Sequence, residues 1–161
     1  MKDKNIYLIG MPSCGKTTIG RVLAAKLRRE FLDTDIMIEK ATGQSIPELH
    51  EQIGEEMFRD LESGVLSGVS EKKGAVIATG GGSVLREENR AYMGSGTVVW
   101  LLRDLALLSL EGRVHKGRVT VEKLFSDRKD KYASFADFTA DNNGTPEECA
   151  LEIIEKLGLG G

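Results

Sequence analysis

Several features that would narrow the function are scarce in this 161-residue chain. Cysteine occurs only at positions 14 and 149, which is too few for a disulfide framework or a zinc-binding spacing and favours a reduced cytoplasmic protein. No apolar run approaches the roughly 20 residues of a membrane-spanning helix. Basic residues are not in excess, and the net charge of −3 argues against a nucleic acid or an anionic membrane as a partner. Residues 1–5 lead directly into an apolar run, so we expect no secretory segment.

The most specific motif present lies near the N-terminus. Gly10-Met11-Pro12-Ser13-Cys14-Gly15-Lys16-Thr17 has the form G-x-x-x-x-G-K-T and separates the apolar run 6–9 from a helical pattern that starts near Thr18. This context is typical of a phosphate-binding loop, whose backbone N–H groups and following helix N-terminus bind phosphate oxygens. We expect Lys16 to reach the β- and γ-phosphates and Thr17 to ligate Mg²⁺. The residues expected to line this nucleotide site are Ser13, Cys14, Gly15, Lys16, Thr17 and Thr18. The alternative is a glycine-rich turn between a strand and a helix.

Apolar runs and helical repeats alternate along the whole chain. We expect strands at 6–9, 31–35, 75–79, 97–102 and 138–141, with helical patterns between them, including one at about 55–71 and another at 105–110. Capping boxes are predicted at Ser45–Glu48 and Thr145–Glu148, and the final helix should present Leu151, Ile154 and Leu157 to the core. The pattern predicts one α/β domain over 1–161, with a five-stranded parallel sheet flanked by helices.

Two carboxylates follow the second expected strand. Ligands of parallel sheets bind outside the carboxyl ends of the strands, where Asp33 and Asp35 would lie close to the phosphate-binding loop. Two residues apart on a strand, they would point to the same side. One could hold Mg²⁺ through water while the other accepts a hydrogen bond from an acceptor hydroxyl. The alternative is that one of them caps the following helix.

Glycines and arginines supply further candidates. Gly80-Gly81-Gly82 would let the backbone approach a ligand closely and bind an oxyanion, whereas the alternative is a flexible turn. Arg59 lies three residues before Glu62 on an expected helix, so the carboxylate could orient the guanidinium. The alternative for any single arginine is a solvated surface position, and this default also applies to Arg113, Arg118 and Arg128. The two histidines, His50 and His115, are assigned no role.

Several motifs in a fixed order resemble one family. They are Gly10–Thr17, F31-x-D33-x-D35-x-x-I38-E39, T42-G43-x-S45-I46-x-E48, G54-E55-x-x-F58-R59-x-x-E62 and A78-T79-G80-G81-G82-S83-V84. In this order and spacing the chain resembles the shikimate kinases, P-loop kinases of the nucleoside-monophosphate-kinase type. The resemblance covers nearly the whole chain and implies transfer of a phosphoryl group from ATP to the 3-hydroxyl of shikimate, with Mg²⁺, in aromatic amino-acid biosynthesis.

The resemblance also implies roles for individual residues. Asp35 would bind and polarise the shikimate hydroxyl, and Asp33 would act on Mg²⁺ through water. Arg59, oriented by Glu62, would bind substrate, as would the amide of Gly81.

The C-terminal part of the resemblance rests on L124-x-x-x-R128-x-x-x-Y132-x-x-x-A136-D137, where Arg128 takes the place of the arginine that binds the substrate carboxylate. The lid segment, here 112–120, is shorter than is usual in the family. Our alignment makes Arg118 the lid arginine that contacts ATP, with Arg113 as the other candidate. The implied catalytic set is therefore Lys16, Asp35 and Arg118, and the implied shikimate-binding subregion is 33–62.

Two other functions remain open at this point. A related kinase acting on a gluconate-like acceptor would use the same loop but would not explain the ordered set of Asp35, Arg59 and Gly81. A nucleotide-binding regulatory module without turnover would explain the short lid. For the kinase we expect shikimate and ATP as the binding partners, no nucleic acid or membrane partner, a monomer and a cytoplasmic location.

Overall fold

The computed structural model describes residues 3–108 and 120–159. Its sheet has five parallel strands in the order β2-β3-β1-β4-β5, which confirms the predicted architecture. The strands are β1 (Ile6–Ile9), β2 (Phe31–Asp33), β3 (Val76–Ala78), β4 (Thr97–Leu102) and β5 (Phe138–Asp141). The helices are α1 (Lys16–Leu27), α2 (Thr34–Thr42), α3 (Ile46–Val69), α4 (Glu88–Met93), α5 (Val121–Phe135) and α6 (Pro146–Leu157), with short 3-10 turns η1 (Ser83–Leu85) and η2 (Leu105–Leu107).

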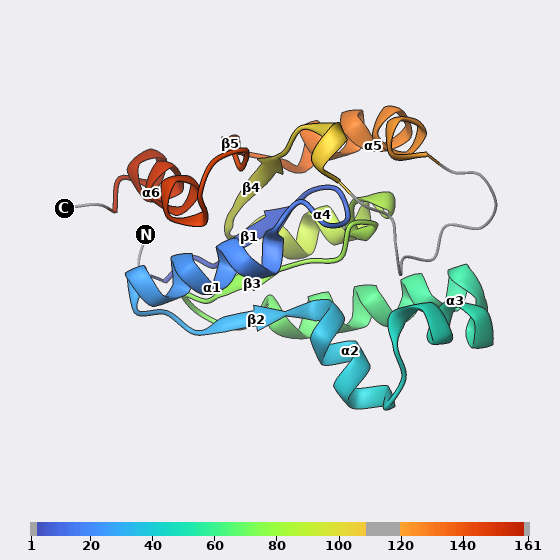
Figure 1. Ribbon diagram of the computed structural model, residues 1–161. Coiled ribbons are helices and arrows are strands. Elements are labelled where there is room, and N and C mark those ends of the chain that lie inside the picture. The colour runs from blue at the N-terminus through green and yellow to red at the C-terminus, as the bar shows by residue number, and fades with distance from the viewer. Residues whose placement is uncertain (1–2, 109–119, 160–161) are drawn as a thin grey trace.

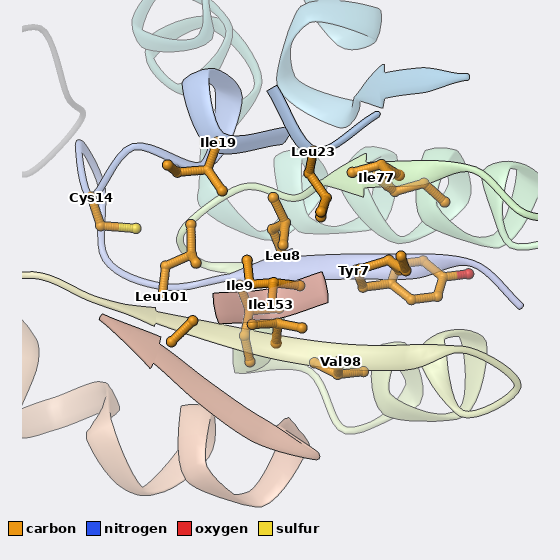
Figure 2. Packing of buried hydrophobic residues seen from close by; sticks show 14 of the residues in the cluster. Tyr7, Leu8, Ile9, Cys14, Ile19, Leu23, Ile77, Val98, Leu101 and Ile153 are labelled. Atoms are coloured by element: carbon orange, nitrogen blue, oxygen red, sulfur yellow. The ribbon is translucent and has the colours of Figure 1, made fainter. Parts of the chain in front are cut away.

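Strands β1 and β3 lie inside the sheet and are buried along their whole length, because helices cover the sheet. Helices α1 and α6 pack against each other, while α3, α4 and α5 are joined through contacts with one another or with η1 (Figure 1). All four residues of β1 are buried, as expected for a parallel strand covered on both faces. Figure 2 shows Ile19 and Leu23 of α1 and Ile153 of α6 among the side chains of the strands. The main core therefore surrounds β1, the strand that leads into the phosphate-binding loop.

A second, smaller core lies between α2 and α3. Ile38, Leu49 and Phe58 form a separate buried cluster that joins α2 to α3. The predicted capping box is confirmed, since Ser45 Oγ accepts from the Glu48 backbone N–H and Glu48 accepts from the Ser45 backbone N–H. Gly54 (φ 82°, ψ 167°) is not helical, so α3 consists of two helical segments joined by a kink, and the longer one begins after Gly54, as predicted.

Three local predictions were wrong. Asp35 lies in the first turn of α2, because the second strand ends at Asp33. Leu151 is 55% exposed, and α6 turns Cys149, Ala150, Ile153, Ile154 and Leu157 to the core. The helix expected at 105–110 is, in its described part, only the short turn η2. Among the described residues, no helix is long and apolar enough to cross a membrane.

The second core predicts a measurable contribution to stability. Leu49→Ala should lower the free energy of unfolding by about 2–5 kcal/mol, since it removes a buried side chain from a packed cluster. The matched control is Leu151→Ala, the same change at an exposed helical site, which should stay within about 0.5 kcal/mol of the parent. Urea denaturation followed by circular dichroism measures both. Equal, small effects would show that the α2–α3 cluster does not stabilise the fold.

Candidate active site

The loop between β1 and α1 adopts backbone conformations that explain its residue types. Gly10 (φ 151°) and Gly15 (φ 100°) occupy the region of positive φ that favours glycine. Ser13 also has a positive φ, 64°, although it has a side chain. Because α1 begins at Lys16, its unpaired N–H groups open onto the loop. The helix dipole and these donors make the loop a favourable place for an anion.

The ends of β4 and β5 hold the loop in this shape. A Cβ on Gly10 would lie 2.9 Å from the carbonyl oxygen of Leu101, and a Cβ on Gly15 would collide with the amide of Asn142. The same amide donates a hydrogen bond to the Cys14 carbonyl at 2.7 Å. Sequence reasoning missed Asn142, and its only signal was its place directly after the last strand. Contacts at both of its outer glycines and at Cys14 therefore fix the shape of the loop.

Lys16 and the loop form one wall of a cleft of about 480 Å³. The ammonium of Lys16 donates to the carbonyls of Gly10 and Met11, at 2.8 and 2.9 Å, which keeps it over the loop. Cys14 lines a separate hollow of about 350 Å³ on another side of the loop, together with Trp100 and Asn143. The predicted site residues that line the cleft are Ser13, Gly15, Lys16, Thr17, Thr18, Asp33, Asp35, Arg59, Gly81 and Arg128.

Asp33 caps α2, which was the alternative role left open by the sequence, and it also contacts the phosphate-binding loop. Its Oδ1 accepts from the backbone N–H of Ile36 at 3.1 Å and caps α2. Its Oδ2 accepts from the Thr17 hydroxyl at 2.5 Å. A carboxylate and a hydroxyl oxygen thus lie together at the end of the phosphate-binding loop, and both are hard oxygen donors of the kind that Mg²⁺ prefers.

The glycine run is explained by space, not by backbone angle. None of Gly80, Gly81 and Gly82 has a positive φ. A Cβ on Gly80 would lie 2.8 Å from Asp35 Oδ1 and 2.6 Å from Glu62 Oε2, and one on Gly82 would collide with the Arg59 guanidinium. Asp35 lines the cleft, but it extends from α2. The prediction that Asp35 would extend from the strand, on the same side as Asp33, was wrong.

Charged groups gather opposite the loop and are largely buried. Glu62, 2% exposed, accepts from Arg59 Nη1 at 2.9 Å. Burial raises the pKa of Glu62, while the charges of Arg59 and Arg128 and the Arg59 hydrogen bond oppose that rise. Arg128 is also buried, and the buried Nε of Arg59 has no hydrogen-bond partner among the described residues. This cluster is suited to binding an anionic group.

His50 lies in the wall of the cleft, although it was assigned no role from the sequence. His50 lines the cleft, with its ring centroid 4.0 Å from that of Phe58. The predicted capping box puts residue 50 on the same short helix as Ile46, which was the only signal available. Arg113 and Arg118 lie outside the described residues, as does the lid segment up to residue 119.

Comparison with known proteins gives a consistent result. The family model described as shikimate kinase matches residues 12–158. A shikimate kinase of Gloeobacter violaceus is 47% identical over 169 residues, which cover 98% of this chain and 94% of that protein.

Solved structures agree with the sequence comparison. The shikimate kinase of Acinetobacter baumannii in complex with shikimate has a TM-score of 0.88 at 36% identity, covering 96% of this chain and 92% of that one. A gluconokinase of Sinorhizobium meliloti has a TM-score of only 0.58 at 13% identity, over 98% of this chain and 93% of that one, which shows a shared fold alone. The chain belongs to the shikimate kinase family.

Proposed function

We propose that this chain transfers the γ-phosphoryl group of ATP to the 3-hydroxyl of shikimate, giving shikimate 3-phosphate and ADP. The observation that carries the proposal is that one cleft contains both the phosphate-binding loop and the acceptor set of Asp35, Arg59, Gly81 and Arg128. Phosphoryl transfer depends mainly on positioning and charge neutralisation, and the two halves of the cleft supply both.

The donor half would bind the triphosphate and its metal. Backbone N–H groups of residues 13–18 bind phosphate oxygens, and Lys16 neutralises the β- and γ-phosphates. The Thr17 hydroxyl would ligate Mg²⁺ directly and Asp33 would do so through water, which fits their 2.5 Å contact. When bound, Mg²⁺ supplies positive charge to the phosphate oxygens, and it commonly uses one or two protein oxygens together with phosphates and water. The hollow lined by Cys14, Trp100 and Asn143 lies beside the loop and suits the base of ATP.

The acceptor half would orient shikimate by its two kinds of polar group. Arg59 and Arg128 bind the carboxylate, because guanidinium groups pair with carboxylates through two parallel hydrogen bonds. Asp35 accepts a hydrogen bond from the 3-hydroxyl and takes its proton as the oxygen attacks the γ-phosphorus. The bond from that phosphorus to the bridging oxygen then breaks, and ADP leaves.

The remaining predictions complete the proposal. We assign the ATP-contacting lid residue to Arg118, with Arg113 as the other candidate, and the shikimate-binding subregion to 33–62. We also propose a monomer in the cytoplasm with no nucleic acid or membrane partner. Two features support this: donor and acceptor groups of the cleft come from one chain, and its net charge is −3.

Acceptor specificity tests the proposed function. With ATP and Mg²⁺, the purified protein should release ADP only when shikimate is added, and ³¹P NMR should identify the 3-phosphate. Gluconate should not support any release of ADP. Activity with gluconate and not shikimate would favour the alternative kinase, and ATP binding without any turnover would favour the regulatory module.

Asp35→Asn should lower kcat by about 10²–10⁴-fold, because an amide cannot accept the hydroxyl proton. The KM for ATP should stay within about twofold, since Asp35 faces the acceptor side of the cleft. Steady-state kinetics with each substrate varied separates the two effects. A variant that keeps parental kcat would refute the role given to Asp35.

Gly82→Ala should raise the KM for shikimate by about tenfold or more, because the added methyl displaces the Arg59 guanidinium and weakens a charged contact. The matched control is Gly64→Ala on α3, where an added Cβ meets nothing within 4 Å. This control should keep both KM values and gain roughly 0.5–1 kcal/mol in stability from its helical position. Equal KM values for shikimate in the two variants would contradict the steric account.

A further inference from the structure

Tyr132 is a buried tyrosine of α5 whose hydroxyl reaches the glycine run. The residue is 0% exposed, and its ring lies 5.6 Å from that of Trp100 on β4. Its hydroxyl donates a hydrogen bond to the carbonyl oxygen of Gly81 at 2.7 Å. The bond links two segments 51 residues apart in the sequence, and Gly81 lies in the wall of the cleft.

An acceptor-facing arginine lies near the same hydroxyl. Arg128 is one helical turn before Tyr132 on α5, close enough for its charge to act on the tyrosine hydroxyl. Burial raises the pKa of Tyr132 to about 12, with the charge of Arg128 opposing the rise. The hydroxyl therefore stays protonated at neutral pH and can accept from Arg128 while it donates to Gly81.

Gly81 in turn lies against the phosphate-binding loop. A Cβ at this position would be 3.0 Å from Cδ of Pro12, so the backbone packs directly on the loop. Three successive glycines have no side chains to restrict them, and their conformation has to be fixed by contacts. The carbonyls of Gly80 and Gly82 accept from Ser83 and Leu85 within the following turn. The Gly81 carbonyl is held from outside the turn, by Tyr132.

We propose that Tyr132 is a positioning residue for the acceptor: its hydroxyl fixes the Gly81–Gly82 peptide and the Arg128 guanidinium relative to each other and to the phosphate-binding loop. The inference rests on the proposed function, in which both groups face shikimate. Without the hydroxyl, the Gly81 carbonyl loses its donor and Arg128 loses an orienting partner. Acceptor binding should suffer while the donor half, held by Asn142 and β4, remains intact. The competing explanation is a core tyrosine whose hydroxyl is merely satisfied.

Tyr132→Phe removes the hydroxyl and keeps the ring, and Tyr7→Phe is the matched control. Tyr7 of β1 is equally buried, and its hydroxyl accepts from the side-chain amide of Asn5, the residue directly before β1. Tyr132→Phe should raise the KM for shikimate by roughly tenfold, as expected for loss of an orienting hydrogen bond, and leave the KM for ATP within twofold. Tyr7→Phe should change neither value.

A double-mutant cycle with Arg128→Lys completes the test. If Tyr132 acts through Arg128, the two losses of shikimate affinity should not add. An unchanged KM for shikimate in Tyr132→Phe, equal rises for both substrates, or fully additive losses would each overturn the inference. Wild-type turnover of shikimate is measured first, because its absence would refute the proposed function itself. Normal wild-type turnover with an unaffected Tyr132→Phe variant would refute only the role of Tyr132.

Discussion

The close approach of the backbone at Gly80–Gly82 to its neighbours is the constraint on which the cleft depends. Asp35 and Glu62 contact the space that a Cβ of Gly80 would fill, Arg59 does so at Gly82, and Pro12 of the phosphate-binding loop does so at Gly81. The glycine run follows β3, and it has side chains of α2 and α3 on one side and the phosphate-binding loop on the other. A side chain at Gly80 or Gly82 would displace the charged groups that lie against these positions.

Two arginines and a glutamate form a largely buried charged cluster in the cleft. Arg59 and Arg128 are both largely buried, and Glu62, which is hydrogen-bonded to Arg59, is itself held at a raised pKa by its burial. Burying charges is unfavourable unless each is paired and hydrogen-bonded. A substrate carboxylate would supply the missing partner, for example to the buried Nε of Arg59.

The sequence predicted the elements well where local signals were strong. Strands β1, β4 and β5 lie where their apolar runs placed them, and both capping boxes form, because these features depend on neighbouring residues. It left open whether Asp33 would cap the following helix, it ended the second strand two residues too late, and it wrongly turned Leu151 to the core. Those outcomes depend on packing between distant segments. For the same reason the Tyr132–Gly81 contact had no signature in the sequence, and His50 and Asn142 had only a weak positional signal.

A crystal structure with ADP, Mg²⁺ and shikimate bound would show whether one cleft holds the phosphoryl donor and the acceptor together. We expect the shikimate carboxylate on the guanidinium groups of Arg59 and Arg128, the 3-hydroxyl on Asp35, and the β-phosphate in the loop near Lys16. Shikimate bound with its carboxylate away from both arginines, or outside the cleft that the loop lines, would contradict the proposal.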